Sequence, residues 1–408
     1  ERPGVAEAAD FEPVFGLLQG EAILGERAKK LCRLALRIAA VDREAASPLL
    51  VDRLAEFIVS ARVGEAPELL AEVMLAGGLD YVRENLSDTR PQIRVTAASV
   101  LAEHGREEDR ERLVALLEDP SLEVQVAAVR MLGDRHVQSA RAELVARARL
   151  APPPMRVPAL RAIGQLGSEL DGKTRDDLFA TLVDARTDPN PVVRAAAIDG
   201  LAALNDARCA SLLVGVLGQG DRSSGYDVAR DGLRALGEQA WSELLRAAYS
   251  PAHRARRDAA LLLSAQLVPE SFSILLTLFT DAPDDDAVAW ELCVLSARDY
   301  RREVDPSLAW WDWWDEADHA HACSCLRSAR EAGGLVVPPA EAFDGEGTRE
   351  GVEFLIRALT IEEPCLRERA RRELERMLGE PLAPLPARGS DSTQWATELA
   401  DRVRAHFE

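Results

Sequence analysis

Apolar residues recur at steps of three and four positions in three separate stretches of the chain. These stretches are PQIRVTAASVLAEHG from Pro91, PSLEVQVAAVRMLGD from Pro120 and PVVRAAAIDGLAAL from Pro191. This spacing places the apolar side chains on one face of a helix. A leading proline suits the first turn of a helix, because its missing N–H would have no partner there. The pattern therefore predicts three alanine-rich amphipathic helices.

The same helix recurs further along the chain, with shorter amphipathic segments such as EDRERLVALLED and DDLFATLVDAR in between. The unit is a helical hairpin that repeats roughly every 28 to 38 residues, and it cannot bury its apolar face alone. We therefore expect an all-α fold, an α-solenoid of stacked hairpins. With Arg94 as the register mark, the equivalent positions are Gln125, Arg156, Arg194, Ala229, Arg257, about Val288, and Arg367.

An aspartate, a proline and a Val/Ile–Arg pair introduce several of these helices. Asp88 stands six residues before Arg94, Asp188 six before Arg194, and Asp119 six before Gln125, where the arginine is missing. The pattern resembles HEAT repeats, most clearly over residues 78–297, with the register defined over 86–204. In HEAT arrays the turn Asp and the helix Arg commonly pair between adjacent repeats. The resemblance thus implies a structural role for Asp88, Arg94, Asp188 and Arg194. The alternative is a row of arginines that binds an anion.

The segments outside the array predict smaller parts of the chain. The first unit of a solenoid needs a polar outer face that contacts solvent. The helical segments at the start of the chain lack the repeat signature and therefore suggest a cap or divergent repeats. Glycine and proline density predicts a linker or irregular loop before the last hairpin. The predicted parts are a cap at 1–77, the array at 78–297, a Trp-rich capping segment at 298–330, a linker at 331–350 and a C-terminal hairpin with a Trp-bearing tail helix at 351–408.

Four of the seven tryptophans lie within five residues, in the sequence WWDWW. The stretch is similar to a Trp-rich tail that follows HEAT arrays in some bacterial repeat proteins. On a helix Trp310, Trp313 and Trp314 share one face, while Trp311 points elsewhere. We expect Trp310 and Trp314 to pack inward as a cap on the end of the array, and Trp311 to be more exposed. The alternatives are a surface for a partner or ligand, and an aromatic cage for a cation.

Two histidines and then two cysteines follow the tryptophans at every second position, at His319, His321, Cys323 and Cys325. On a helix, residues two apart point in nearly opposite directions, so each face offers half of a tetrahedral zinc site. In a strand the four side chains share a face but spread over roughly 20 Å. We therefore expect no metal here, and a metal-dependent switch is the alternative. No Walker, GxGxxG, HExxH or GxSxG motif occurs, so no catalytic residue and no cofactor is predicted.

The charge and composition narrow the range of partners. A net charge of −20 disfavours binding to nucleic acid. No apolar run is long enough to span a membrane. Six cysteines in 408 residues do not suggest a disulfide framework, so a cytoplasmic location is expected. The chain begins at Glu1 rather than Met, which is also compatible with a removed signal peptide. Only three basic residues are lysines (Lys29, Lys30 and Lys173), which with the abundant alanine suggests a GC-rich bacterial genome.

These observations favour a non-catalytic scaffold or adapter with an extended acidic surface, which binds a protein with a basic face. The alternative is an enzyme or enzyme accessory, because HEAT-like arrays also occur in bilin-lyase subunits and alkylpurine DNA glycosylases. The first would need a ligand-sized pocket. The second would need a basic groove with aromatic residues and a catalytic Asp, which the net charge disfavours.

Overall fold

The computed structural model describes residues 66–167, 172–221, 225–316, 348–359 and 363–379, together with positions 52, 54, 55, 170, 343, 361, 381, 382 and 399. These residues form helices and turns, and no strand occurs among them, so the predicted all-α fold is confirmed. The chain divides into two compact units, one that ends at Leu204 and one that begins at Asn205. Within the described residues, each unit consists mainly of helices, most of them joined by short turns.

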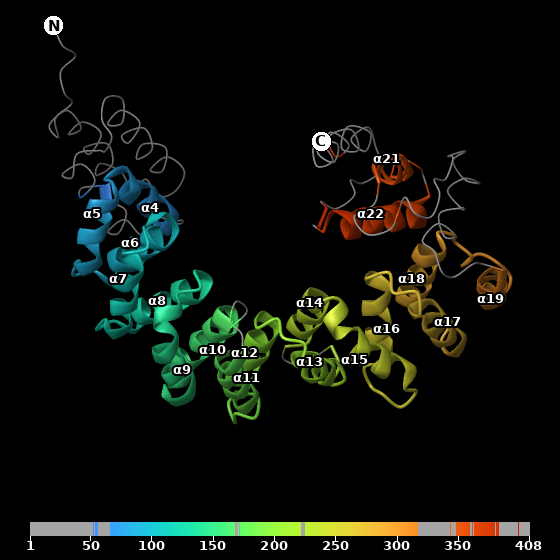
Figure 1. Ribbon diagram of the computed structural model, residues 1–408, viewed down its shortest axis with the longest axis horizontal. Coiled ribbons are helices and arrows are strands. Elements are labelled where there is room, and N and C mark those ends of the chain that lie inside the picture. Colours follow the sequence, from blue (N-terminus) through green and yellow to red (C-terminus); the bar gives the residue numbers. More distant parts are fainter. Residues whose placement is uncertain are drawn as a thin grey trace, which may run out of the picture. The chain divides into compact units, whose positions relative to one another are not determined.

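Unit 1 consists of consecutive helical hairpins, which run from blue to green in Figure 1. The second helices of the hairpins, α6, α8, α10 and α12, begin at or just after a proline, as the repeat pattern predicts. The helices are α4 (Ala66–Ala76), α5 (Leu79–Glu84), η3 (Asn85–Ser87), α6 (Pro91–His104), α7 (Asp109–Ala115), η4 (Leu116–Glu118), α8 (Leu122–Asp134), η5 (Gln138–Ala140), α9 (Arg141–Leu150), α10 (Pro153–Gly167), α11 (Gly172–Ala185) and α12 (Pro191–Ala203).

The second helices of successive hairpins lie side by side in unit 1. Helix α6 packs against α8, α8 against α10, and α10 against α12. The apolar stripe of each second helix is fully buried; Ile93, Val124, Ile163 and Val193 all have no solvent exposure. The hydrophobic face that one hairpin cannot cover is thus covered by its neighbours, as expected for a solenoid.

Two glycines bring the backbones of α10 and α12 into direct contact. A Cβ atom on Gly164 would lie 2.2 Å from the carbonyl oxygen of Gly200. A Cβ atom on Gly200 would lie 2.6 Å from the carbonyl oxygen of Leu160. Any larger side chain at either position would therefore have to push main-chain atoms apart. In α8, Gly133 makes a similar approach, because a Cβ there would come within 2.7 Å of Ala162 in α10.

Unit 2 continues with hairpins and then changes character. Its helices are α13 (Cys209–Leu217), α14 (Tyr226–Leu236), α15 (Glu238–Tyr249), α16 (Arg256–Ala265), α17 (Ser271–Asp281), α18 (Asp286–Ser296), α19 (Pro306–Glu316), α21 (Arg349–Ala358) and α22 (Pro364–Leu378). The last of these, α22, packs against both α21 and α18. The C-terminal hairpin therefore rests on the last helix of the preceding repeat.

The predicted boundaries between the cap, the array and the C-terminal segments remain predictions. Most of the cap at 1–77, the His319–Cys325 stretch, most of the linker at 331–350 and most of the tail after Leu378 lie outside the described residues.

Candidate interaction surface

Arg94 and Asp119 form a buried ion pair that joins two adjacent repeats. Arg94 Nε donates to Asp119 Oδ2 at 2.8 Å, and Arg94 Nη2 donates to Asp119 Oδ1 at 2.7 Å. Both side chains are less than a tenth exposed. The carboxylate also accepts the main-chain N–H of Ser121, which holds it at the start of α8. Arg94 therefore binds the turn aspartate of the next hairpin.

Two further pairs repeat this arrangement. Arg156 Nη1 lies 2.8 Å from Asp188 Oδ2, which belongs to the following turn. Arg257 contacts Asp285 through both Nε, at 2.5 Å, and Nη2, at 2.8 Å. Asp285 is also the N-cap of α18 and accepts the N–H of Ala287. We call the three pairs, Arg94–Asp119, Arg156–Asp188 and Arg257–Asp285, the ladder.

Within a repeat, the register residue bonds the main chain of the turn aspartate rather than its carboxylate. Arg94 Nη1 donates to the carbonyl of Asp88 at 2.7 Å, and Arg194 Nη1 donates to the carbonyl of Asp188 at 2.8 Å. Gln125 Nε2 makes the same bond to the carbonyl of Asp119 at 2.6 Å, so it takes the place of the missing arginine. The Asp88 carboxylate is held instead by Arg90 in its own turn.

Two of the ladder pairs lower the pKa of their aspartate. The hydrogen bonds from Arg94 hold the pKa of Asp119 below its usual value, although burial opposes the shift. Arg257 does the same to the pKa of Asp285. Arg194 has no carboxylate partner among the residues that the structure describes. The guanidinium groups of Arg94, Arg156 and Arg257 are thus each paired with an aspartate of the ladder.

The second helices of unit 1 present an ordered set of side chains to solvent. On each helix, three positions at i, i+7 and i+11 share one face and are exposed or half-buried. We call this set the second-helix face. It comprises Gln92, Ser99 and Glu103 on α6; Glu123, Arg130 and Asp134 on α8; Pro154, Arg161 and Gln165 on α10; and Val192, Asp199 and Ala203 on α12.

Some members of the second-helix face bridge neighbouring helices. Gln165 Nε2 donates to Asp134 Oδ1 at 2.7 Å, and Arg161 Nε donates to Asp199 Oδ2 at 2.6 Å. In the described part of the chain, Glu123 and Arg130 form no ion pair, and Glu103 contacts only His104, at 3.9 Å. The face therefore carries four carboxylates against two guanidinium groups, one of which is already paired.

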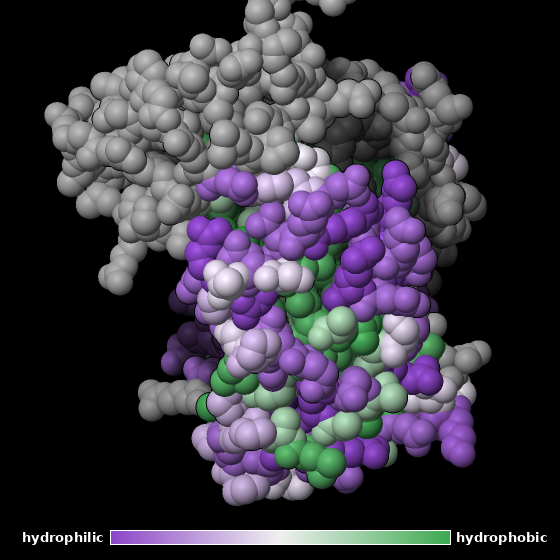
Figure 2. Space-filling model, turned by 90° about the vertical axis from the view of Figure 1, so that its left-hand side faces the viewer, coloured by the Kyte–Doolittle hydropathy of each residue, from purple (hydrophilic) through white to green (hydrophobic). Residues whose placement is uncertain are grey.

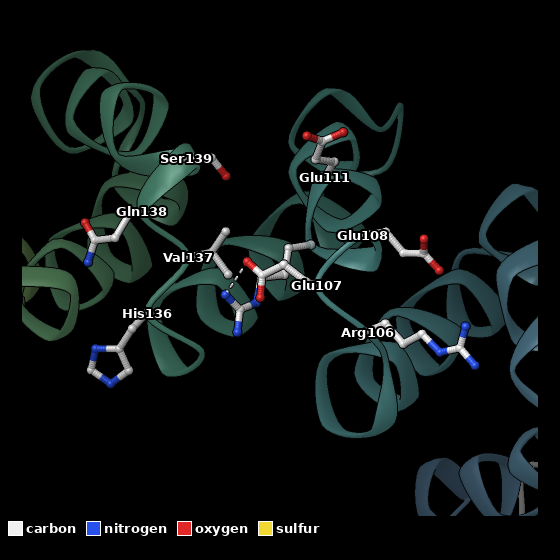
Figure 3. Close-up of a pocket in the computed structure, with 9 residues that line it drawn as sticks. Arg106, Glu107, Glu108, Glu111, His136, Val137, Gln138 and Ser139 are labelled. Carbon is white, nitrogen blue, oxygen red and sulfur yellow. Dashed lines mark hydrogen bonds and ion pairs between the residues drawn. The ribbon is translucent and has the colours of Figure 1, made fainter.

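A hollow of about 820 Å³ lies at one edge of unit 1, between the turn before α7 and the turn after α8. Figure 3 shows Glu107 beside Val137, with Glu108 and Glu111 on the α7 side and His136 and Gln138 on the other. Glu107 accepts a hydrogen bond from Arg110 at 2.6 Å. The lining is open and mixes acidic, basic, polar and apolar side chains.

One side of unit 1 is largely hydrophilic. Figure 2 shows narrow hydrophobic patches enclosed by hydrophilic residues on this side. Among the described residues of unit 1, the exposed large apolar side chains are Leu75, Leu122, Leu150 and Val192. Scattered apolar residues of this kind are ordinary on a protein surface.

The tryptophans of α19 pack on α17. Trp310 has no solvent exposure, and its ring meets Phe279 edge-on at 5.1 Å and Tyr300 at 6.1 Å. Trp314 stacks on Phe272 at 4.7 Å, and Trp313 lies tilted against the same ring at 4.9 Å. Trp311, Trp313 and Trp314 are all half-buried. The two phenylalanines are seven residues apart on one face of α17, so α19 lies along that face.

The sequence patterns did not reveal how the C-terminal hairpin is held. Arg372 of α22 donates to both carboxylate oxygens of Glu291 in α18, at 2.7 and 2.9 Å. Ser264 of α16 donates to the same carboxylate at 2.8 Å. Three helices thus converge on one half-buried acid, Glu291. The signal is hidden because Glu291 and Arg372 lie 81 residues apart in the chain and belong to no shared motif.

No helix in the described residues combines the length and the apolar character needed to cross a membrane. No curated protein matches the sequence. Among solved structures, an engineered protein is 18% identical, with 92% of each chain covered and a TM-score of 0.39. The karyopherin Kap121p, bound to the extreme C-terminus of the protein phosphatase Cdc14p, is 13% identical with a TM-score of 0.40. That match covers 91% of this chain, which spans less than half (46%) of the karyopherin.

The family comparison agrees with the hairpins, the ladder and the proline-led helices described above. Residues 79–164 match the family of HEAT repeats. These residues contain the Arg94–Asp119 pair, the second helices α6 and α8, and most of α10. The family match therefore lies in unit 1, where residues 79–164 are similar to HEAT repeats.

Proposed function

We propose that the protein is a non-catalytic scaffold that binds a protein partner along the second-helix face of unit 1. The observation that carries the proposal is the regular presentation of three solvent-facing positions on each of four adjacent helices. The buried apolar stripes of these four helices, and the contact of Gly164 with Gly200, hold the helix backbones in place. Extended surfaces of this kind are what solenoids use to bind partners.

The charges on the face favour a partner with a basic patch. Glu103 and Glu123 are exposed acids without an arginine partner in the described residues, and the chain as a whole carries −20. Complementary charge raises the rate of association and discriminates against partners of the wrong sign. Because exposed charges are screened, such binding should weaken as salt is added.

The location proposed for this scaffold is a reducing compartment, the cytoplasm. Cys293 and Cys365 are buried free thiols. Free thiols are the usual state of cysteine in reducing compartments, whereas oxidising ones favour disulfides.

A charge-reversal comparison tests the proposal. The full chain and the variant Glu103→Arg/Glu123→Arg are used to capture proteins from an extract of the source cells, with quantitative mass spectrometry. The control is Asp177→Arg/Asp184→Arg, which makes the same change in charge at exposed positions of α11, the first helix of its hairpin, away from the second-helix face. We expect a partner that wild type and control retain and that the test variant loses by at least about tenfold. Equal loss from both variants would show that only net charge matters, and unchanged capture by the test variant would place the partner elsewhere.

A further inference from the structure

Two buried thiols and a carboxylate converge where the C-terminal hairpin meets the preceding repeat. Cys293 lies in α18, Asp299 in the turn that follows it, and Cys365 in the first turn of α22. Their ligand atoms all lie within 4.8 Å of one another. Both cysteines are buried, whereas Asp299 is exposed, so the group is closed on the protein side and open on one side to solvent.

The turn after α18 aims Asp299 back at Cys293. Ala297 has a left-handed backbone, with φ of 52°, and its N–H bonds the carbonyl of Val294. The N–H of Arg298 bonds the carbonyl of Cys293 at 3.1 Å, which completes a Schellman turn and reverses the chain. A left-handed conformation is costly for a residue other than glycine, so this reversal is maintained by its surroundings. Asp299 Oδ1 then accepts the thiol S–H of Cys293 at 3.5 Å.

An arginine completes the surroundings of the three groups. Arg301 donates to Asp299 from Nε at 2.8 Å and from Nη2 at 2.7 Å, and its guanidinium lies 5.6 Å from the ring centre of Trp290. It therefore fixes the orientation of the carboxylate and provides a positive charge beside it. A cation bound by two thiolates and one carboxylate would form a complex of net charge −1 if divalent, which Arg301 would offset.

We propose that Cys293, Asp299 and Cys365 bind a zinc ion that clamps the C-terminal hairpin onto α18. Zinc prefers thiolate and carboxylate ligands in tetrahedral geometry, with bonds of about 2.3 Å to sulfur and about 2.0–2.2 Å to oxygen. Such bonds place neighbouring ligand atoms roughly 3.5–3.8 Å apart, which needs a movement of about an ångström from the positions observed. A water molecule occupies the fourth position, on the side open to solvent.

Binding exchanges protons for the ion. The two thiol protons leave to solvent as the Zn–S bonds form, and no oxidation or reduction takes place. Loss of the Cys293 proton removes one of three hydrogen bonds to Asp299 Oδ1, which also accepts the main-chain N–H and the Nε–H of Arg301. The carboxylate can then turn toward the metal. The clamp adds to the contact of Arg372 with Glu291, which already joins α22 to α18.

Cobalt and zinc titrations of the full chain test the proposal. The protein is reduced with a phosphine, freed of metal, and titrated with Co²⁺ and then with Zn²⁺ under anaerobic conditions. We expect one Co²⁺ per chain, a thiolate-to-cobalt charge-transfer band, and loss of that band when zinc displaces the cobalt. Zinc should also raise the temperature of unfolding of the wild type.

Matched variants assign the ligands. Cys293→Ser and Cys365→Ser should each abolish the band and the thermal shift, and Asp299→Ala should weaken zinc binding by at least about tenfold, a loss seen even for groups that only orient a ligand. Cys209→Ser, which alters a buried thiol in α13, should leave both signals intact. His321→Ala/Cys325→Ala should do the same. If that double variant loses the band while Cys293→Ser keeps it, or if the reduced wild type takes up no metal, the proposal is wrong.

Discussion

Arg94 of one repeat donates two parallel hydrogen bonds, of 2.8 and 2.7 Å, to the carboxylate of Asp119 in the next repeat. Both side chains are almost completely buried. Planar guanidinium and carboxylate groups match in this geometry, and charge-assisted pairs of this kind are stronger than neutral ones. The pair acts between hairpins, whereas the bonds from Arg94 to the carbonyls of Asp88 and Thr89 act within one. One side chain therefore sets both the local turn and the contact with the neighbour.

The first prediction compares this arginine with its counterpart outside the ladder. Arg94→Ala should lower the free energy of unfolding by about 3–5 kcal/mol, because it leaves the Asp119 carboxylate buried without its partner. Arg194→Ala removes only bonds to the carbonyls of Asp188 and Pro189, so we expect a loss of about 1–3 kcal/mol. Urea unfolding followed by circular dichroism measures both. Equal losses would mean that the carboxylate contact adds nothing to stability.

The second prediction concerns acid. The pKa of Asp119 and the pKa of Asp285 are lowered in the folded protein by their arginines. An unfolded aspartate titrates near about 3.9, so as the pH falls below that value the unfolded state takes up protons first. The stabilisation is therefore complete above this pH and is lost as the pH falls through the lower, folded pKa.

Comparing urea midpoints at about pH 5 and about pH 3 makes this measurable. Wild type should lose stability over this interval, and Asp119→Asn should lose less of it, because its side chain no longer titrates. Asp184→Asn, an exposed change on α11, should follow the wild-type curve. An Asp119→Asn curve parallel to wild type would show that acid acts elsewhere.

The third prediction concerns the tryptophans of α19. Trp310→Ala should cost about 3–5 kcal/mol, because a fully buried ring packed between Phe279 and Tyr300 is replaced by a cavity. Trp311→Ala removes a half-buried ring for which no ring stacking occurs among the described residues, and its loss should be well below that of Trp310→Ala. Thermal unfolding of the two variants provides the comparison. The idea fails if Trp311→Ala is the more damaging change.

The fourth prediction uses two helical glycines with opposite surroundings. Gly164→Ala places a methyl group 2.2 Å from the carbonyl oxygen of Gly200, so it should destabilise by about 1–3 kcal/mol in spite of the higher helix propensity of alanine. Gly215→Ala in α13 meets nothing within 4 Å and should stabilise by about 0.5–1 kcal/mol. Chemical denaturation of both variants decides the matter, and a stabilising Gly164→Ala would show that the helices can separate freely.

The hairpins could be predicted from the sequence because their signal is local. Three- and four-residue apolar steps, a leading proline and a turn aspartate all lie within one repeat. The predicted inter-repeat pairing of an Asp with an Arg has a counterpart in Arg94–Asp119, where both residues stand in register.

Other contacts had no such local signal. Asp285 precedes the register position of its helix by three residues rather than six, so the pattern does not mark it as the partner of Arg257. Cys293 and Cys365 lie in different parts of the chain and come together only when α22 packs on α18. The His319–Cys325 stretch, whose candidate ligands stand close together in sequence, lies outside the described residues.

The contact between Gly164 and Gly200 has a consequence for recognition. Side chains can adopt other rotamers when a partner arrives, whereas two touching main chains cannot come closer or yield without rebuilding both helices. The distance between the rows that carry Arg161 and Asp199 is thereby set before any encounter. A partner that matches this spacing would find the surface already ordered, and would lose less conformational entropy on docking than it would against a surface that has to adjust. Preorganisation of this kind favours slow dissociation of a matching partner over binding of many different partners. Replacing Gly164 or Gly200 with alanine, at a contact buried beneath the second-helix face, would therefore shorten the lifetime of the complex.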